Sequence, residues 1–121
     1  ALDHMLNCLI RIVDGLILYP ARMQANLNLT RGLIFSSKVL LALVDTGITR
    51  EDAYKIVQRN SMAVWDDVHA AVDGPNLRER LEADPECTVS SEKLDEIFDP
   101  WDFLTRIDVV FKRLETLSFE E

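Results

Sequence analysis

A proline interrupts an amphipathic pattern near the start of the chain, and this interruption constrains the fold more than any other feature. Before Pro20, apolar residues recur every three or four positions, as on one face of an α-helix. They are Leu2, Met5, Leu6, Leu9, Val13, Leu16 and Ile17. Proline lacks an amide donor and its ring clashes with the preceding turn, so a helix that runs through Tyr19 cannot continue. The stretch from Tyr19 to Ser36 is therefore predicted to be a structural joint.

Later segments carry the start and stop signals of further helices. Residues 21–27 are expected to form one or two helical turns. Thr30 is then expected to cap a helix over residues 33–44, which is apolar almost all round and belongs at the centre of a domain. Gly47 stands in the usual C-terminal glycine position of that helix.

Three more predicted helices begin with a capping residue before an apolar stripe. The caps are Thr49, Asn76 (with Glu79 at capping-box spacing) and Ser90. The helix after Thr49 is expected to bury Ala53, Val57, Val64, Val68 and Ala71 and to stop at Gly74-Pro75. No segment alternates between apolar and polar residues as a strand does. The sequence thus predicts an all-α chain, and 121 residues are enough for one domain.

The last predicted helix starts at Asp99-Pro100, a capping acid followed by a first-turn proline. It is expected to bury Phe103, Leu104, Ile107, Val110, Phe111 and Leu114. Trp65 and Trp101 are interpreted as anchors in the core or between helices, with burial at a partner interface as the alternative. Residues 118–121 are expected to fray.

The charge of the chain is uneven. The net charge of −8 divides into +2 over residues 1–60 and −10 over residues 61–121. The second half would be repelled by a phosphate backbone, so nucleic-acid binding is not expected. No apolar run is long enough to cross a bilayer, and no membrane association is expected. Cys8 and Cys87 have no partner spacing, which favours reduced thiols and a cytoplasmic location.

No group of residues has the pattern of a self-contained active site. His4 and His69 have no partner at metal-ligand spacing and are interpreted as surface residues, with contact to another part of the protein as the alternative for His4. The serines Ser36 and Ser37 are expected to bond to a carbonyl one turn back or to face a neighbouring helix. The acids Glu92, Asp95, Glu96, Asp99 and Asp102 lack the glycine and spacing of a calcium loop and are expected to act as caps and surface charges. We therefore assign no catalytic, substrate-binding, cofactor-binding or metal-binding residue.

Two arginines flank the joint. Arg22 and Arg31 place a cation beside a change of chain direction, where it can bind a carboxylate or a phosphate. The alternative is that such a cation fixes a loop through backbone carbonyls or a nearby acid. They are the first residues to test for contact with a ligand.

The order of these motifs resembles the C-terminal domain of the adenylosuccinate lyases, which belong to the fumarase/aspartase superfamily. The resemblance rests on Tyr19-Pro20, Met23, Asn26-Leu27, Thr30, Gly32 to Ser36, Val39 to Val44, Gly47, Thr49 to Tyr54, Val57 to Asn60, Ser90 to Leu94 and Phe98-Asp99. It covers nearly the whole chain, and the ordered series is more specific than any one piece of it.

The resemblance implies a cofactor-free, homotetrameric C–N lyase of purine biosynthesis. Such enzymes release fumarate from adenylosuccinate, giving AMP, and from the succinyl-carboxamide ribotide. In this family the general base is a serine in a flexible loop and the general acid is a histidine, and both lie upstream of a segment like this one. Residues 1–18 would then be the C-terminal end of a long central-bundle helix, and residues 19–121 the all-helical C-terminal domain.

These implications define the partners and the expected activity of the chain. The partners are the rest of the parent enzyme and its homo-oligomer, and a small nucleotide substrate binds only in the intact enzyme. The isolated chain is expected to be inactive and to self-associate through its first helix, because the apolar stripe is left uncovered. The alternative is a stand-alone helical module for protein–protein interaction.

Overall fold

The computed structural model describes residues 1–117 and contains helices and no strands within that range, which confirms the prediction of an all-α chain. The α-helices are α1 (Leu2–Asp14), α2 (Pro20–Asn28), α3 (Ser36–Asp45), α4 (Arg50–His69), α5 (Leu77–Ala83), α6 (Ser91–Ile97) and α7 (Ile107–Glu115). Two short 3-10 helices, η1 (Leu33–Phe35) and η2 (Pro100–Leu104), lie between them. The expected fraying of residues 118–121 falls outside the described residues.

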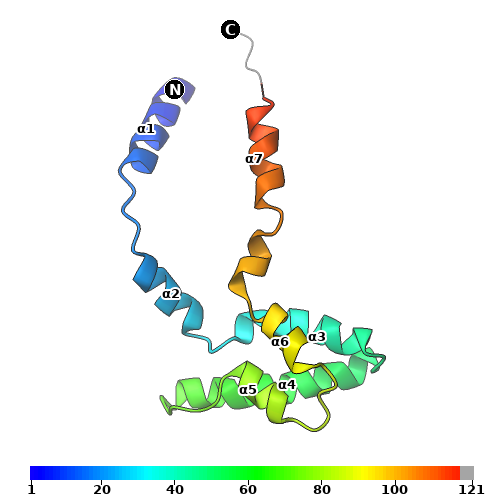
Figure 1. Ribbon diagram of the computed structural model, residues 1–121. Coiled ribbons are helices and arrows are strands. Elements are labelled where there is room, and N and C mark those ends of the chain that lie inside the picture. Colours follow the sequence, from blue (N-terminus) through cyan, green and yellow to red (C-terminus); the bar gives the residue numbers. More distant parts are fainter. Residues whose placement is uncertain (118–121) are drawn as a thin grey trace.

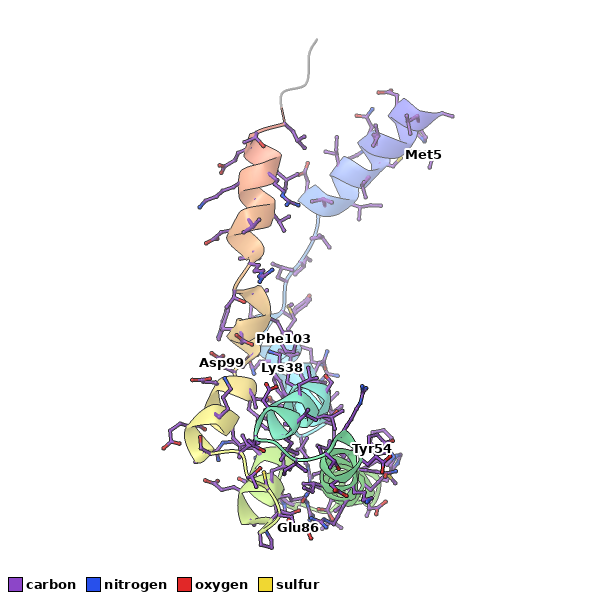
Figure 2. All side chains as sticks on the ribbon, turned by 90° about the vertical axis from the view of Figure 1, so that its right-hand side faces the viewer. Met5, Lys38, Tyr54, Glu86, Asp99 and Phe103 are labelled. Carbon is purple, nitrogen blue, oxygen red and sulfur yellow. The ribbon has the colours of Figure 1, made fainter. Side chains whose placement is uncertain are left out.

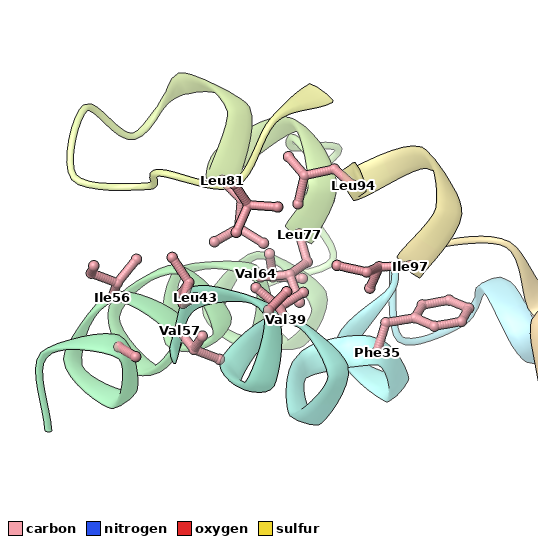
Figure 3. Packing of buried hydrophobic residues seen from close by; sticks show 13 residues of the cluster. Phe35, Val39, Leu43, Ile56, Val57, Val64, Leu77, Leu81, Leu94 and Ile97 are labelled. Carbon is pink, nitrogen blue, oxygen red and sulfur yellow. The ribbon is translucent and has the colours of Figure 1, made fainter. Parts of the chain in front are cut away.

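Residues 33–97, from η1 to the end of α6, gather into one helical body, and α1, α2 and α7 extend from it on the same side (Figure 1). The core of the helical body lies between α3, α4, α5 and α6 (Figure 3). Its buried apolar residues are Phe35, Val39, Ala42, Leu43, Ala53, Ile56, Val57, Val64, Leu77, Leu81, Val89, Leu94 and Ile97. Val39 and Leu43 of α3 are fully buried, as expected for the central helix, although Leu41 on its outer side is exposed.

The predicted caps at Thr49, Asn76, Ser90 and Asp99 form as the sequence indicates. Thr49 Oγ1 accepts a hydrogen bond from the amide of Asp52 at 3.2 Å. Asn76 and Glu79 make both bonds of a capping box, at 3.0 and 2.9 Å. Ser90 and Asp99 cap the next two elements, α6 and η2, in the same way. Local chemistry therefore determines where these elements begin.

Three predicted boundaries are wrong. The first helix ends at Asp14 rather than Tyr19, because Gly15 follows and glycine is a poor helix former. Thr30 caps nothing, and its hydroxyl is buried with no hydrogen-bond partner in the described part of the chain. The helix after Thr49 ends at His69, before Gly74, and Ala71 leaves it with φ of 52°.

The prediction that the last helix is buried is also wrong. It divides into η2 and α7, and the apolar side chains of α7 are 41–57% exposed. Trp101 is 72% exposed and Trp65 is 44% exposed, so neither is a core anchor of this chain. The apolar side chains of α7 stay exposed because the helix extends away from the helical body and has no surface of that body to pack against (Figure 1).

None of the individual helices in residues 1–117 is both long and apolar enough to cross a bilayer. Only the pair formed by Pro20–Asn28 and Leu33–Asp45, bent by 69°, reaches the required length and composition when taken together.

Candidate functional site at the joint

The joint turns the chain through two residues with positive φ. Arg31 has φ of 47° and Gly32 has φ of 89°, both in the left-handed region. A Cβ atom on Gly32 would lie 2.8 Å from Cε1 of Phe98. The position thus requires glycine for two reasons, the backbone conformation and the close approach of an aromatic ring.

Arg31 fixes a loop of the helical body. Its guanidinium donates to the carbonyl oxygens of Val72 at 2.8 Å and Gly74 at 3.3 Å, and its own carbonyl accepts from the amide of Leu77 at 3.0 Å. Its Nη2 is also 4.0 Å from a carboxylate oxygen of Asp73. Two roles were predicted for Arg31: binding a ligand carboxylate or phosphate, and holding a loop. The structure supports the second role, because the guanidinium bonds to the carbonyls of Val72 and Gly74.

A hollow of about 470 Å³ lies beside this turn, between α2 and the helical body. Its apolar lining includes Leu27, Ile34 and Phe98, and its polar lining includes the amides of Gln24 and Asn28. Arg78 also borders it, but that side chain pairs with Asp95, Glu82 and Ser91. The hollow therefore offers apolar surface and the amides of Gln24 and Asn28, while the amide of Asn76 caps α5. Both arginines among its described lining residues, Arg31 and Arg78, are paired with other groups.

The other candidate residues do not converge on this hollow. Arg22 and His4 are exposed on α2 and α1, respectively. Nε2 of His4 is 3.6 Å from Sγ of Cys8, one turn along α1. His69 is exposed, as expected, and contacts the edge of Trp65 with ring centroids 4.5 Å apart. In the described part of the chain, no three histidine, cysteine or acidic residues are arranged to hold a metal ion.

The remaining candidates have structural roles. Ser36 is half-buried and Ser37 is exposed on α3. The acidic group is divided among separate partners, as expected for caps and surface charges: Asp95 binds Arg78, Glu96 binds Lys93, and Asp99 caps η2.

Asp102 joins η2 to α3. Its carboxylate accepts from Nζ of Lys38 at 2.6 Å, and this hydrogen bond lowers the pKa of Asp102. Nζ of Lys38 also lies 3.8 Å from the ring centre of Phe103 (Figure 2). The Phe103 ring in turn stacks on Phe35, with ring centroids 5.8 Å apart. These contacts fix the base of the segment that leads to α7.

A buried polar network was not found by sequence reasoning. Asn60 is the only buried polar residue of the described chain. Its side-chain amide donates to the carbonyl of Ile56 at 2.9 Å and to Asp84 at 2.6 Å, and Arg59 also binds Asp84.

The pKa of Asp84 is lowered in this network. Burial acts to raise it, but the hydrogen bonds from Asn60, Arg59 and the amide of Glu86 outweigh the effect of burial. The available signal was the place of Asn60 on the buried face, seven residues after Ala53 and four before Val64.

Comparison with known proteins identifies the family. Residues 32–114 match the model of a family described as "Adenylosuccinate lyase C-terminus". The chain belongs to this family. Among curated relatives named adenylosuccinate lyase, that of Streptococcus mutans is 43% identical over 115 residues, which cover 93% of this chain and 25% of the relative. Those of Bacillus subtilis and a Synechocystis strain are each 41% identical, covering 94% and 86% of this chain and 26% and 23% of the relative.

The comparisons agree with the resemblance drawn from the motifs. The chain spans about a quarter of the length of the curated relatives it matches. It is thus similar to one domain of those proteins, and a stand-alone interaction module receives no support from them.

Proposed function

We propose that this chain is the C-terminal domain of an adenylosuccinate lyase that cleaves a C–N bond and releases fumarate. The proposed substrates are adenylosuccinate and the succinyl-carboxamide ribotide. The observation that carries the proposal is the match to the C-terminal family over residues 32–114, together with 41–43% identity along most of the chain.

The proposed role of the domain is structural. The elimination requires a base to remove a proton beside a carboxylate of the succinyl group and an acid to protonate the departing nitrogen. We assign neither role to this chain: His4 is exposed on α1, and His69 contacts Trp65 on the outside of α4. The serine and histidine of the family would be supplied by the rest of the polypeptide, which needs no cofactor for this reaction.

We also propose a domain boundary at the joint. Residues 1–18 would belong to the C-terminal end of a central-bundle helix, with α1 (Leu2–Asp14) as its helical part, and residues 19–121 would be the C-terminal domain. The absence of any buried residue in α1 supports this division, because an amphipathic helix with an uncovered apolar face requires another surface. A homotetramer in the cytoplasm is the proposed setting, and the free thiols Cys8 and Cys87 are compatible with it.

Fumarate release from adenylosuccinate tests the proposal. The full-length polypeptide is expected to release fumarate, and the purified 121-residue chain is expected to release none. Deleting residues 19–121 from the full-length enzyme is expected to reduce its stability or its assembly. Activity of the isolated chain would contradict the structural role, and an inactive full-length polypeptide that is folded and tetrameric would contradict the proposed reaction.

A further inference from the structure

Helix α7 presents an apolar face that nothing in the described chain covers. Ile107, Val110, Phe111 and Leu114 follow helical spacing and are between 41% and 57% exposed. Asp108 and Lys112 lie on the other side of the helix. A nine-residue helix has marginal stability in water unless its apolar face packs on a surface. The face of α7 therefore requires a partner.

The base of α7 is anchored, so the direction of this face is set by the helical body. Asp99 caps η2, and the contacts of Lys38 with Asp102 and Phe103 hold η2 against α3. Only two residues separate η2 from α7, and the hydroxyl of Thr105 donates to the carbonyl of Asp102 at 2.8 Å. The helix is thus presented from a fixed base rather than carried on a long linker.

Helix α1 has the same property and lies on the same side of the helical body. Its apolar side chains are at least half exposed, among them Leu6, Leu9 and Val13. Both views of the molecule show α1 and α7 rising from the same side, away from α4 and α5 (Figures 1 and 2). Because the exposed apolar faces of α1 and α7 extend toward the same region, one additional folded segment in that region could cover both of them.

We propose that the apolar face of α7 docks on the part of the same polypeptide that precedes Ala1. This inference rests on the proposed function. About three quarters of the length of each relative lies outside the part matched here, and the family is the C-terminal one. That additional chain would connect through α1, at the end of the molecule toward which α7 also extends. Because both surfaces belong to one polypeptide, docking proceeds at a high effective concentration.

A second copy of this chain is a poorer occupant. The family match extends to residue 114 and thus includes nearly all of α7, so the helix is part of the domain as it exists in a much longer polypeptide. Pairing through α7 would also bring together two chain halves that each carry a net charge of −10. Like charges at that density oppose association.

Photo-crosslinking in the full-length polypeptide tests the docking. A benzophenone amino acid replaces Phe111 on the apolar face, and the control carries the same group in place of Lys112 on the other side of α7. The Phe111 probe is expected to give a product of single-polypeptide mass whose crosslinked peptide precedes Ala1, with several-fold higher yield than the control. A product of doubled mass, a crosslink within residues 1–117, or equal yields from the two positions would overturn the proposal.

Hydrogen exchange supplies a second measurement that does not depend on the probe. Amides of α7 are expected to exchange at least tenfold more slowly in the full-length polypeptide than in the isolated 121-residue chain. Equal exchange rates in the two proteins would also overturn the docking. Fumarate release is measured on the same preparation: its absence counts against the proposed reaction alone, whereas the crosslink and the exchange rates report on α7 alone.

Discussion

Replacing Gly32 by alanine is predicted to destabilise the chain through two separable effects. The residue has φ of 89°, where an L side chain is strained by about 1–2 kcal/mol. The added Cβ would also lie 2.8 Å from the Phe98 ring. That ring cannot easily retreat, because it packs against Phe35 with centroids 5.2 Å apart. Such overpacking adds about 1–3 kcal/mol.

Gly47 provides a matched control for the backbone effect. Its φ is 97°, close to that of Gly32, and no atom lies within 4 Å of the position that a Cβ would occupy. Gly47→Ala should therefore cost only the backbone strain, about 1–2 kcal/mol. Gly32→Ala should cost about 2–5 kcal/mol in total. The difference between the two variants isolates the contact with Phe98.

Urea unfolding of the 121-residue chain, followed by far-UV circular dichroism, measures both free energies by linear extrapolation. In a double-mutant cycle, Phe98→Ala should cost less in the Gly32→Ala background than in the native chain, because removing the ring relieves the clash. The reasoning is refuted if Gly32→Ala and Gly47→Ala destabilise the chain equally. It is also refuted if the two substitutions at 32 and 98 are additive.

Two further predictions concern the partly buried carboxylate of Asp84 and the exposed first helix. The pKa of Asp84 is lowered on folding, so its stabilising contribution is present above the unfolded pKa and is lost as the pH falls through the folded pKa. Asp84→Asn should thus lower the free energy of unfolding by about 1–2 kcal/mol at pH 7 and by much less below the folded pKa; a difference independent of pH would contradict this. Leu9 is 55% exposed on the apolar face of α1, and Leu9→Asp places a charge there. This substitution should reduce self-association of the isolated chain, measured by sedimentation velocity. The control, Asn7→Asp on the same helix, should leave self-association unchanged. Equal association of the two variants would exclude the α1 face as the contact.

Local chemistry allowed most helix starts to be predicted, but not all helix ends. The caps at Thr49, Asn76 and Ser90 involve hydrogen bonds within four residues, so the sequence contains both partners. The end of α4 at His69 and the turn at Arg31 depend on contacts with distant loops, such as the bonds from Arg31 to Val72 and Gly74. These partners are more than forty residues apart in the chain, which no local pattern reveals.

The features of the candidate site follow the same rule: those set by neighbouring residues could be predicted from the sequence, and those set by contacts between distant residues could not. The ordered series of motifs from Tyr19 to Asp99 suggested the family, and the separate roles of the acidic residues were predicted from their spacing. The network of Asn60, Arg59 and Asp84 was missed, because its hydrogen bonds join α4 to the loop after α5. Burial of Trp101 and of α7 was predicted incorrectly, since amphipathicity shows that a face requires a partner but does not show where that partner lies.

By itself, the sequence determined the helical class, the capped helix starts and the family, because each depends on residue types in a fixed order along the chain. Only the tertiary structure decided which apolar stripes meet. It buried the stripes of α3, α4, α5 and α6 against one another and left those of α1 and α7 exposed on the same side of the helical body. The physical reason is that apolar burial is non-directional: periodicity specifies a face, and the path of the chain through space specifies what covers it.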